Sequence, residues 1–307
     1  MGSRTSSRTL HAVLAQQLAN GLFLGAVYAL FAIGYTLVFG VLDILNLAHA
    51  AIFMAAAFAA LALIGAGLPL WAAFPLAIVF AGVLGIALDR IAFAPLRARN
   101  AGTLVPLISS IGVAIAIGGV ARGLFGPGEH RFPPGTLGAL GDAQVRLGTL
   151  AFSRLDLVIL GVALGLMLAL AYVMRRTPLG RAVRAVAEDR VAAALLGLDL
   201  ERTIALTFFI ASALGGAAGI LIGLQYDSVS LEMGSRIELK GLAIVILGGM
   251  GSVTGAVIGA FILGAVETLS VAYVSSSYRD AVAFGVMFAI LVLRPSGLLG
   301  KRALRAA

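Results

Sequence analysis

Long runs without a charged residue dominate the sequence. A helix that crosses about 30 Å of hydrocarbon needs about 20 residues, because each residue adds about 1.5 Å. Runs that reach or approach this length occupy residues 21–42, 101–121, 157–174, 203–226 and 241–266. This pattern predicts an all-α polytopic integral membrane protein.

Three further stretches refine the number of segments. The run at residues 50–88 is 39 residues long and must hold two spans. Glycines and a proline at 65–69 predict the break between these spans, because glycine loosens the backbone and proline can open the next helix. Glycine-dense residues 248–252 interrupt another run. Residues 281–293 are short, but flanking arginines can snorkel to the interfaces. We expect about eight or nine membrane segments, including broken or re-entrant elements.

The composition agrees with a membrane location. Hydrophobic residues make up 61% of the 307 residues and charged residues only 12%, about half the charged share of a soluble domain. The net charge is +8, but 20 of the 22 basic residues are arginines, mostly in short segments between apolar runs. This charge therefore reports membrane topology rather than nucleic-acid binding. The absence of cysteine excludes disulfides, thiolate metal sites and a cysteine nucleophile.

The N-terminus differs from a secretory signal. Arg4 and Arg8 precede an apolar stretch that is longer than the roughly 7–15 residues of a signal's apolar core. We expect a short polar tail followed by the first transmembrane helix. Residues 1–307 are expected to form a single transmembrane domain.

Basic residues predict the orientation. Segments 89–100, 175–203 and 294–307 hold 3, 6 and 4 basic residues, and the positive-inside rule places them in the cytoplasm. Segment 122–156 is rich in glycine and proline and is expected outside. Three spans precede the first cytoplasmic segment, which puts the N-terminus outside, whereas its two arginines favour the inside. We therefore favour a broken or re-entrant element near residues 43–49, and the side of the N-terminus stays open.

Three polar residues lie in that element. Asp43, Asn46 and His49 are spaced i, i+3, i+6 and would share one flank of a helix. They either line a translocation pathway, or hold a broken helix in shape, or belong to an interfacial turn. A metal site is not expected, because His49 has no close partner among the other two histidines, His11 and His130.

Glu267 directly follows an apolar run. A carboxylate at the centre of a bilayer is costly, so Glu267 must face protein, water or the interface. It is either a proton-coupling carboxylate in the translocation pathway or a structural acid satisfied by neighbouring serine and threonine hydroxyls, and we favour the second. Lys240, near the start of the same run, is expected to snorkel to the interface.

Glycines recur at four-residue spacing in several spans. The series Gly251, Gly255 and Gly259 places bare backbone on one helix face, which lets another helix approach closely. We expect this face to pack on another transmembrane helix, within the chain or across a pair of chains. Similar pairs at 21/25, 161/165 and 215/219/223 have the same meaning.

The segment 175–203 is too long to be a simple connection. Thr177 and Pro178 form a helix start, and the following helix is expected to run to residue 196 and end at Gly197. Its apolar residues recur at helical spacing, so it either lies on the membrane surface or docks a cytoplasmic partner. We favour docking. The candidate contact residues are Arg181, Ala187, Glu188, Asp189, Ala193 and Gly197.

Catalytic and cofactor motifs are missing from the sequence. It contains no Gly-x-x-x-x-Gly-Lys-Ser/Thr, His-Glu-x-x-His or Gly-x-Ser-x-Gly. We expect no catalytic residue and no cofactor. Any energy source must lie in another chain or in an ion gradient.

Several motifs together resemble the bacterial branched-chain amino acid ABC transporter permeases, in particular their shorter, H-type subunit. The motifs are Asn-Gly-Leu-Phe-Leu-Gly-Ala-Val-Tyr-Ala-Leu at 20–30, Asn-Leu-Ala-His at 46–49, Arg-Thr-Pro-Leu-Gly-Arg at 176–181, Leu-Gly-Gly-Met-Gly-Ser at 247–252 and Leu-Arg-Pro-Ser-Gly-Leu-Leu-Gly at 293–300. Ala50 departs from the family, which usually has glycine there.

This resemblance implies a bacterial inner-membrane importer. Its other parts would be a second homologous permease, two cytoplasmic ATPases that contact segment 175–203, and an external solute-binding protein. The implied solute is a branched-chain or related small amino acid, although relatives also carry urea or amides. The alternative is an ion-coupled secondary transporter in which Asp43, His49 or Glu267 binds the ion. A membrane-embedded enzyme is a third, less favoured reading. A docking helix favours the ATP-driven importer, because a secondary carrier needs no surface for a motor.

Overall fold

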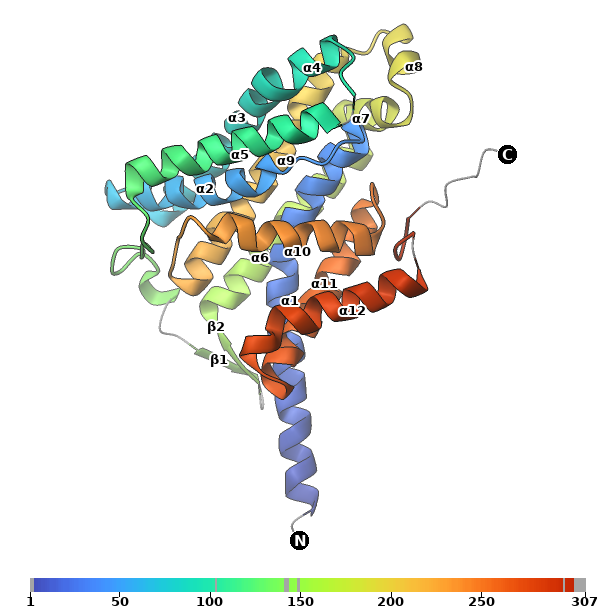
Figure 1. Cartoon of the computed structure of the whole chain (residues 1–307). Coiled ribbons are helices and arrows are strands. Elements are labelled where there is room, and N and C mark those ends of the chain that lie inside the picture. The colour runs from blue at the N-terminus through green and yellow to red at the C-terminus, as the bar shows by residue number, and fades with distance from the viewer. Residues whose placement is uncertain (1–2, 103, 141–143, 148–149, 295, 301–307) are drawn as a thin grey trace.

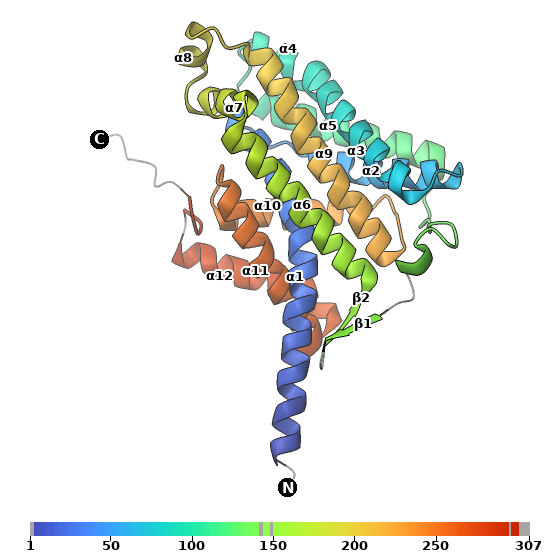
Figure 2. The ribbon, with the colours of Figure 1, turned by 180° about the vertical axis from the view of Figure 1, so that it is seen from behind.

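The computed structural model describes residues 3–102, 104–140, 144–147, 150–294 and 296–300. Within these residues the chain is almost entirely helical, and eight helices are long and apolar enough to cross a membrane. The expected all-α membrane fold is confirmed. Figure 1 and Figure 2 show the bundle from opposite sides.

Most of the long helices contain or overlap the charge-free runs. They are α1 (Ser3–Leu42), α2 (Ala48–Gly65), α3 (Leu70–Leu88), α4 (Ala94–Ala98), α5 (Leu104–Phe125), α6 (Arg154–Arg176), α7 (Pro178–Glu188), α8 (Arg190–Leu195), α9 (Leu200–Tyr226), α10 (Met233–Gly248), α11 (Val253–Tyr273) and α12 (Arg279–Leu293). Short 3-10 turns lie at Gly138–Leu140 and Ser276–Tyr278.

Three helices form the centre of the bundle. The candidate spans in α1, α9 and α2 are 89%, 78% and 67% buried, whereas those in α5 and α6 are each 17% buried. α9 and α2 pack closely in this centre, because a Cβ on Gly219 of α9 would collide with the backbone of Phe53 in α2. The weakly buried helices therefore surround the core and present apolar side chains outward.

Both predicted breaks are confirmed. After α2 the chain turns through Gly67, whose φ of 93° favours glycine, and Pro69 precedes the first residue of α3. The turn between α10 and α11 contains Gly249 and Gly251 with φ of 99° and 81°. The Ser252 hydroxyl then accepts a hydrogen bond of 3.1 Å from the Gly255 N–H and caps α11.

The described C-terminal segment binds back onto this glycine turn. The N–H of Leu298 donates to the carbonyl oxygen of Leu247 at 2.7 Å, and the N–H of Leu299 donates to that of Gly248 at 3.0 Å. These carbonyls belong to the last turn of α10, where a helix leaves its own acceptors unpaired. The segment therefore completes the end of α10.

α1 is longer than expected. The helix already includes Ser3, so the residues expected to form a polar tail continue α1. Its N-terminus lies at the end of the bundle opposite α4, α7 and α8 (Figures 1 and 2). We call the end with these three short helices the α7–α8 end. The 43–47 interruption follows α1 at that end, so α1, α2 and α3 alternate in direction.

Two local features of the fold were not predicted. A π-helical turn, Asp89–Phe93, joins α3 to α4 and accommodates Pro95 just after it. Between α5 and α6, β1 (Gln144–Leu147) pairs antiparallel with β2 (Leu150–Ser153). Gln16 of α1 holds this hairpin through hydrogen bonds of 2.9 and 2.8 Å with the backbone of Ala151.

Candidate functional site

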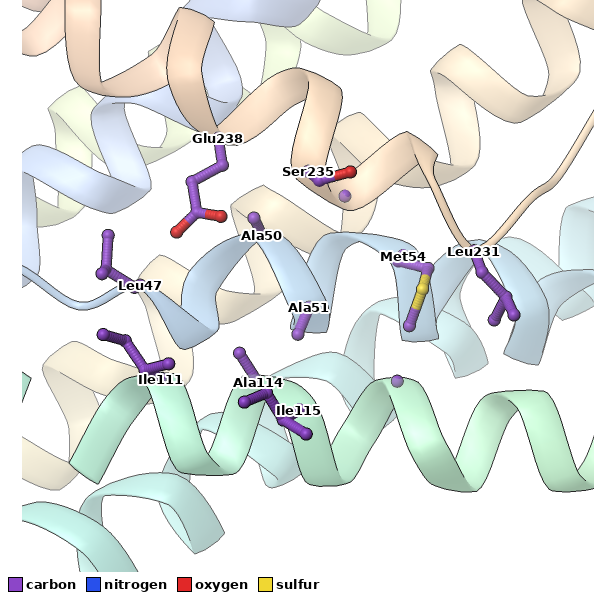
Figure 3. Close-up of a pocket in the computed structure, with 12 residues that line it drawn as sticks. Leu47, Ala50, Ala51, Met54, Ile111, Ala114, Ile115, Leu231, Ser235 and Glu238 are labelled. Carbon is purple, nitrogen blue, oxygen red and sulfur yellow. The ribbon is translucent and has the colours of Figure 1, made fainter. Parts of the chain in front are cut away.

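A cavity of about 320 Å³ opens between α2, α5 and α10 (Figure 3). Its wall is mostly apolar, and Ser235 and Glu238 of α10 contribute its polar side chains. In Figure 3 the carboxylate of Glu238 lies between α10 and the first turn of α2. The remaining side chains shown come from Leu47, Ala50, Ala51, Met54, Ile111, Ala114, Ile115 and Leu231. The volume lies within the roughly 300–1,000 Å³ range of small-molecule sites.

The interruption at residues 43–47 reaches this cavity through its last residue, Leu47. Asp43 has a φ of 56°, a left-handed conformation that ends α1. The Asn46 side-chain oxygen accepts a hydrogen bond of 3.1 Å from the N–H of Ala48, and the N–H of Leu47 donates to the Ser110 hydroxyl of α5 at 3.2 Å. Side chains thus hold backbone groups that no regular helix satisfies.

The three polar residues of this region do not share one helix flank. Asp43 is exposed, whereas Asn46 is 1% and His49 0% exposed. The reason is that residues 43–47 are not helical, so the spacing argument does not apply to them. Their role in a translocation pathway stays a prediction.

His49 fills a slot between α1 and α9. Its ring centroid lies 4.8 Å from that of Phe31 and 5.8 Å from that of Tyr35, and Nε2 lies 3.3 Å from the Phe31 carbonyl oxygen. A Cβ on Gly34 or Gly215 would lie 2.9 or 2.7 Å from the imidazole ring. Glycine at these two positions therefore makes the space that the imidazole occupies.

Glu267 joins four helices through one hydrogen bond and two ion pairs. It is 0% exposed, accepts a hydrogen bond of 2.9 Å from the Tyr28 hydroxyl and pairs with Lys240 at 2.6 Å. Arg279 of α12 also contacts its carboxylate. The expectation that serine and threonine hydroxyls satisfy Glu267 is therefore wrong. Its partners are Tyr28, Lys240 and Arg279, which come from three other helices.

Lys240 does not snorkel to the interface. Its side chain is 13% exposed, and besides Glu267 it pairs with Asp280 of α12 at 3.0 Å. A buried carboxylate within reach stabilises the ammonium inside the bundle, which explains the difference from the expected interface position.

The expected helix of segment 175–203 is two helices. The Thr177 hydroxyl caps α7 by accepting a hydrogen bond of 3.3 Å from the Gly180 N–H. Asp189 then adopts an extended conformation and caps α8, accepting from the N–H groups of Val191 at 2.8 Å and Ala192 at 3.0 Å. An aspartate is a better cap than a helix-interior residue, so the chain turns there instead of continuing.

The two helices bury one face and expose another. Val183, Val186 and Ala193 are buried against the bundle. Three large apolar side chains on α8 and the residue after it are exposed: Val191 at 71%, Leu195 at 84% and Leu196 at 81%. We call these three residues the α8 patch. Among the candidate contact residues, those exposed are Arg181, Ala187, Glu188, Asp189 and Gly197.

A chain of ion pairs and a nearby arginine lie at the α7–α8 end. Buried Asp89 pairs with Arg97 at 2.6 Å, and Arg97 pairs with Glu201 of α9 at 2.8 Å. Burial and the charge of Arg97 lower the pKa of Arg190 from its ordinary value, while Asp43 opposes that shift. An arginine nevertheless stays protonated at physiological pH, so Arg190 remains charged.

The glycine series at 251/255/259 packs within the chain. A Cβ on Gly255 would collide with the backbone of Gly248 in α10, and one on Gly259 would lie 3.0 Å from the Ile244 carbonyl oxygen. Gly251 lies in the turn before α11 and has open space beside it. Close packing therefore joins α11 to α10.

Sequence reasoning did not identify Glu238, Ser235 or the Asp89–Arg97 pair. Glu238 lies between Arg236 and Lys240, in a charged segment that belongs to no charge-free run. The signal that points to it is a carboxylate two residues before Lys240 at the edge of an apolar run.

The sequence is similar over most of its length to permeases of branched-chain amino acid transport systems. Residues 17–291 match a family described as a branched-chain amino acid transport system permease component. The high-affinity branched-chain amino acid transport system permease protein BraD of Pseudomonas aeruginosa is 35% identical over 295 residues, covering 93% of this chain and 95% of the relative. LivH of Escherichia coli K12, of the same description, is 36% identical over 300 residues with the same coverage. A protein of Methanocaldococcus jannaschii described as probable branched-chain amino acid transport permease protein LivH is 26% identical over 279 residues, covering 88% of each chain. No solved structure matches significantly.

Proposed function

The chain belongs to the family of branched-chain amino acid transport permeases, and on that premise we propose that it carries branched-chain or related small amino acids into a bacterial cell as one half of a permease pair. It is a multi-pass membrane permease, a transport subunit without catalytic function, in an ABC transport system. Membership of such a system favours ATPase and binding-protein partners over an ion-coupled carrier. The observation that carries the proposal is the match over nearly the whole chain.

The α8 patch is the proposed contact for an ATPase subunit. Three neighbouring exposed apolar side chains outside the candidate spans are costly in water and are typical of a surface that another protein covers. Val183 and Val186 are buried and hold α7 against the bundle. Because α7 contacts α8, α1 and α9, a force applied to α8 can reach α1 and α9. We propose that Arg181, Ala187, Glu188, Asp189 and Gly197 surround this contact.

This contact fixes the proposed orientation. If the α7–α8 end faces the cytoplasm, segments 89–100 and 175–203 with their many arginines also lie inside, in agreement with the positive-inside rule. The N-terminus of α1 and the β1–β2 hairpin then lie outside, where a solute-binding protein would dock. A cysteine placed at Ala187 should react with a membrane-impermeant thiol reagent only after the membrane is opened, and one placed at Arg146 should react without opening. The reverse pattern would overturn the orientation.

The energy source provides the decisive test. The complex of both permeases and both ATPases is reconstituted in liposomes with the binding protein outside, and radiolabelled leucine uptake is measured. We expect uptake to require ATP and to persist when proton and sodium gradients are collapsed. Uptake that follows an ion gradient without ATP would overturn the proposal.

A further inference from the structure

α10 carries a row of polar side chains on an open face of the bundle. Glu232 and Arg236 are 73% and 76% exposed and pair with each other at 2.9 Å, and Ser235 between them is also exposed. Glu238 follows on the same helix and is half-buried. Such a row is costly in contact with lipid, so this face must meet water or protein.

The row reaches the depth of the core. Gly241, three residues after Glu238, lies directly against the Phe31 ring. Phe31 lies well inside the α1 span of Val13–Leu42. Glu238 is therefore a charged residue at the depth of the transmembrane region, and the cavity beside it does not belong to a surface loop.

Glu238 and Glu267 have different surroundings. Glu267 is already neutralised by Lys240 and Arg279. Within the described part of the chain, Glu238 makes no hydrogen bond or ion pair, and the side chains that line the cavity with it include no basic residue. Its carboxylate is thus available to a cation that enters the cavity.

The opposite wall suits an aliphatic group. Ala50, Ala51 and Met54 of α2 and Ile111, Ala114 and Ile115 of α5 line the cavity together with Glu238. The alanines leave space, and the longer side chains provide apolar contact. One carboxylate beside an apolar wall is complementary to a molecule that carries an ammonium next to a branched hydrocarbon.

We propose that this cavity is a transit site for an amino acid with an apolar side chain, in which Glu238 binds the ammonium group and the α2–α5 wall receives the side chain. This inference rests on the proposed function and deepens it. The site must bind weakly, because a transported solute has to leave it again.

The first test removes the charge. Glu238→Gln should lower leucine uptake by the reconstituted complex about tenfold, as expected when one charged hydrogen-bond partner is lost. The matched control is Glu232→Gln, at the N-cap of the same helix but already paired with Arg236, which should transport normally. Leucine binding to the isolated binding protein is measured in parallel and must not change. If the Glu238→Gln complex takes up leucine as fast as the wild-type complex, the site is wrong, while the proposed function still stands.

A second measurement does not depend on transport. The native chain has no cysteine, so Ser235→Cys provides a single thiol in the cavity wall. A cationic methanethiosulfonate should react faster than an anionic one, and Glu238→Gln in the same background should remove that preference. Failure of both reagents to react, or an unchanged preference in the double variant, would overturn the inference.

A third pair of variants covers the case in which Glu238→Gln does not assemble. Ala114→Phe fills the cavity from α5, whereas Ala116→Phe, on the same helix, adds the same ring at an exposed position that does not line it. Uptake should be lost only in Ala114→Phe, with both complexes purifying intact. Equal uptake by the two variants would overturn the site.

Discussion

Arg190, the first residue of α8, donates a hydrogen bond of 2.7 Å to the backbone carbonyl oxygen of Val41, one residue before the end of α1. A helix leaves its last carbonyls unpaired and carries partial negative charge there, so a guanidinium stabilises this end. The interruption at 43–47 follows immediately, and Leu47 lines the cavity. The proposed ATPase contact is therefore joined to the cavity wall through one arginine.

Arg190→Ala should weaken this connection. We expect uptake to fall about tenfold or more, consistent with the loss of a charge-assisted hydrogen bond worth about 1.5–3 kcal/mol. ATP hydrolysis by the complex should fall less than uptake, because the ATPases still bind. Arg190→Lys should recover part of the uptake. Equal losses of hydrolysis and uptake would argue against a connecting role.

Ala187 and Ala193 separate docking from folding. Ala187→Arg changes an exposed residue and should reduce ATPase co-purification while the permease remains folded. Ala193→Arg changes a 2% exposed residue and should destabilise α8 itself. Ala98→Arg, exposed at the same end on α4, is the control and should have no effect. Normal ATPase binding and uptake by Ala187→Arg would remove this residue from the contact.

Glu267 should be important for stability. Glu267→Leu leaves Lys240 and Arg279 with one fewer compensating charge inside the bundle, and we expect a loss of about 3–5 kcal/mol of unfolding free energy. Glu232→Leu breaks an exposed pair and should cost about 1 kcal/mol or less. Denaturant unfolding of the detergent-solubilised chain measures both. Similar losses for the two variants would contradict the difference in burial.

The slot around His49 predicts a contrast between glycines. Gly215→Ala places a methyl group against the imidazole and should lower the thermal midpoint of the protein. Gly161→Ala, in α6, meets nothing within 4 Å and should leave the midpoint unchanged or raise it, because alanine favours helix. A higher midpoint for Gly215→Ala would show that His49 can move aside.

Cysteine substitution tests the role of the 43–49 element in the pathway. A thiol at Asp43 should react with polar reagents, whereas thiols at Asn46 and His49 should be protected in the conformation described here, because those positions are buried. Reaction at 46 or 49 in an ATP-trapped complex would support their predicted place in the pathway. Protection in every state would assign them a structural role.

The sequence predicted the features that depend on neighbouring residues. Charge-free runs located the spans, and the glycines at 65–67 and 248–251 located two breaks, because the physical causes of both are local. The break at Asp189 was missed although its signal is also local. Aspartate can cap a new helix as well as continue an old one, and the apolar spacing on both sides concealed the choice.

Contacts between distant residues escaped prediction. Tyr28 and Glu267 are 239 residues apart, and Arg190 and Val41 are 149 apart. No periodicity within one segment carries that information. The cavity escaped for the same reason, since its wall comes from three helices and only the tertiary arrangement brings Glu238 opposite the alanines of α2 and α5.

The segment that closes the end of α10 has a practical consequence. A protein shortened before Gly297 would leave the carbonyl groups of Leu247 and Gly248 without the donors that they now have. The turn between α10 and α11 would lose its cover, and α10 bears both Lys240 and Glu238. Truncation boundaries and fusion partners chosen for expression should therefore preserve residues 296–300, since trimming these few residues alters the helix that carries Lys240, the partner of Glu267, and Glu238 of the cavity.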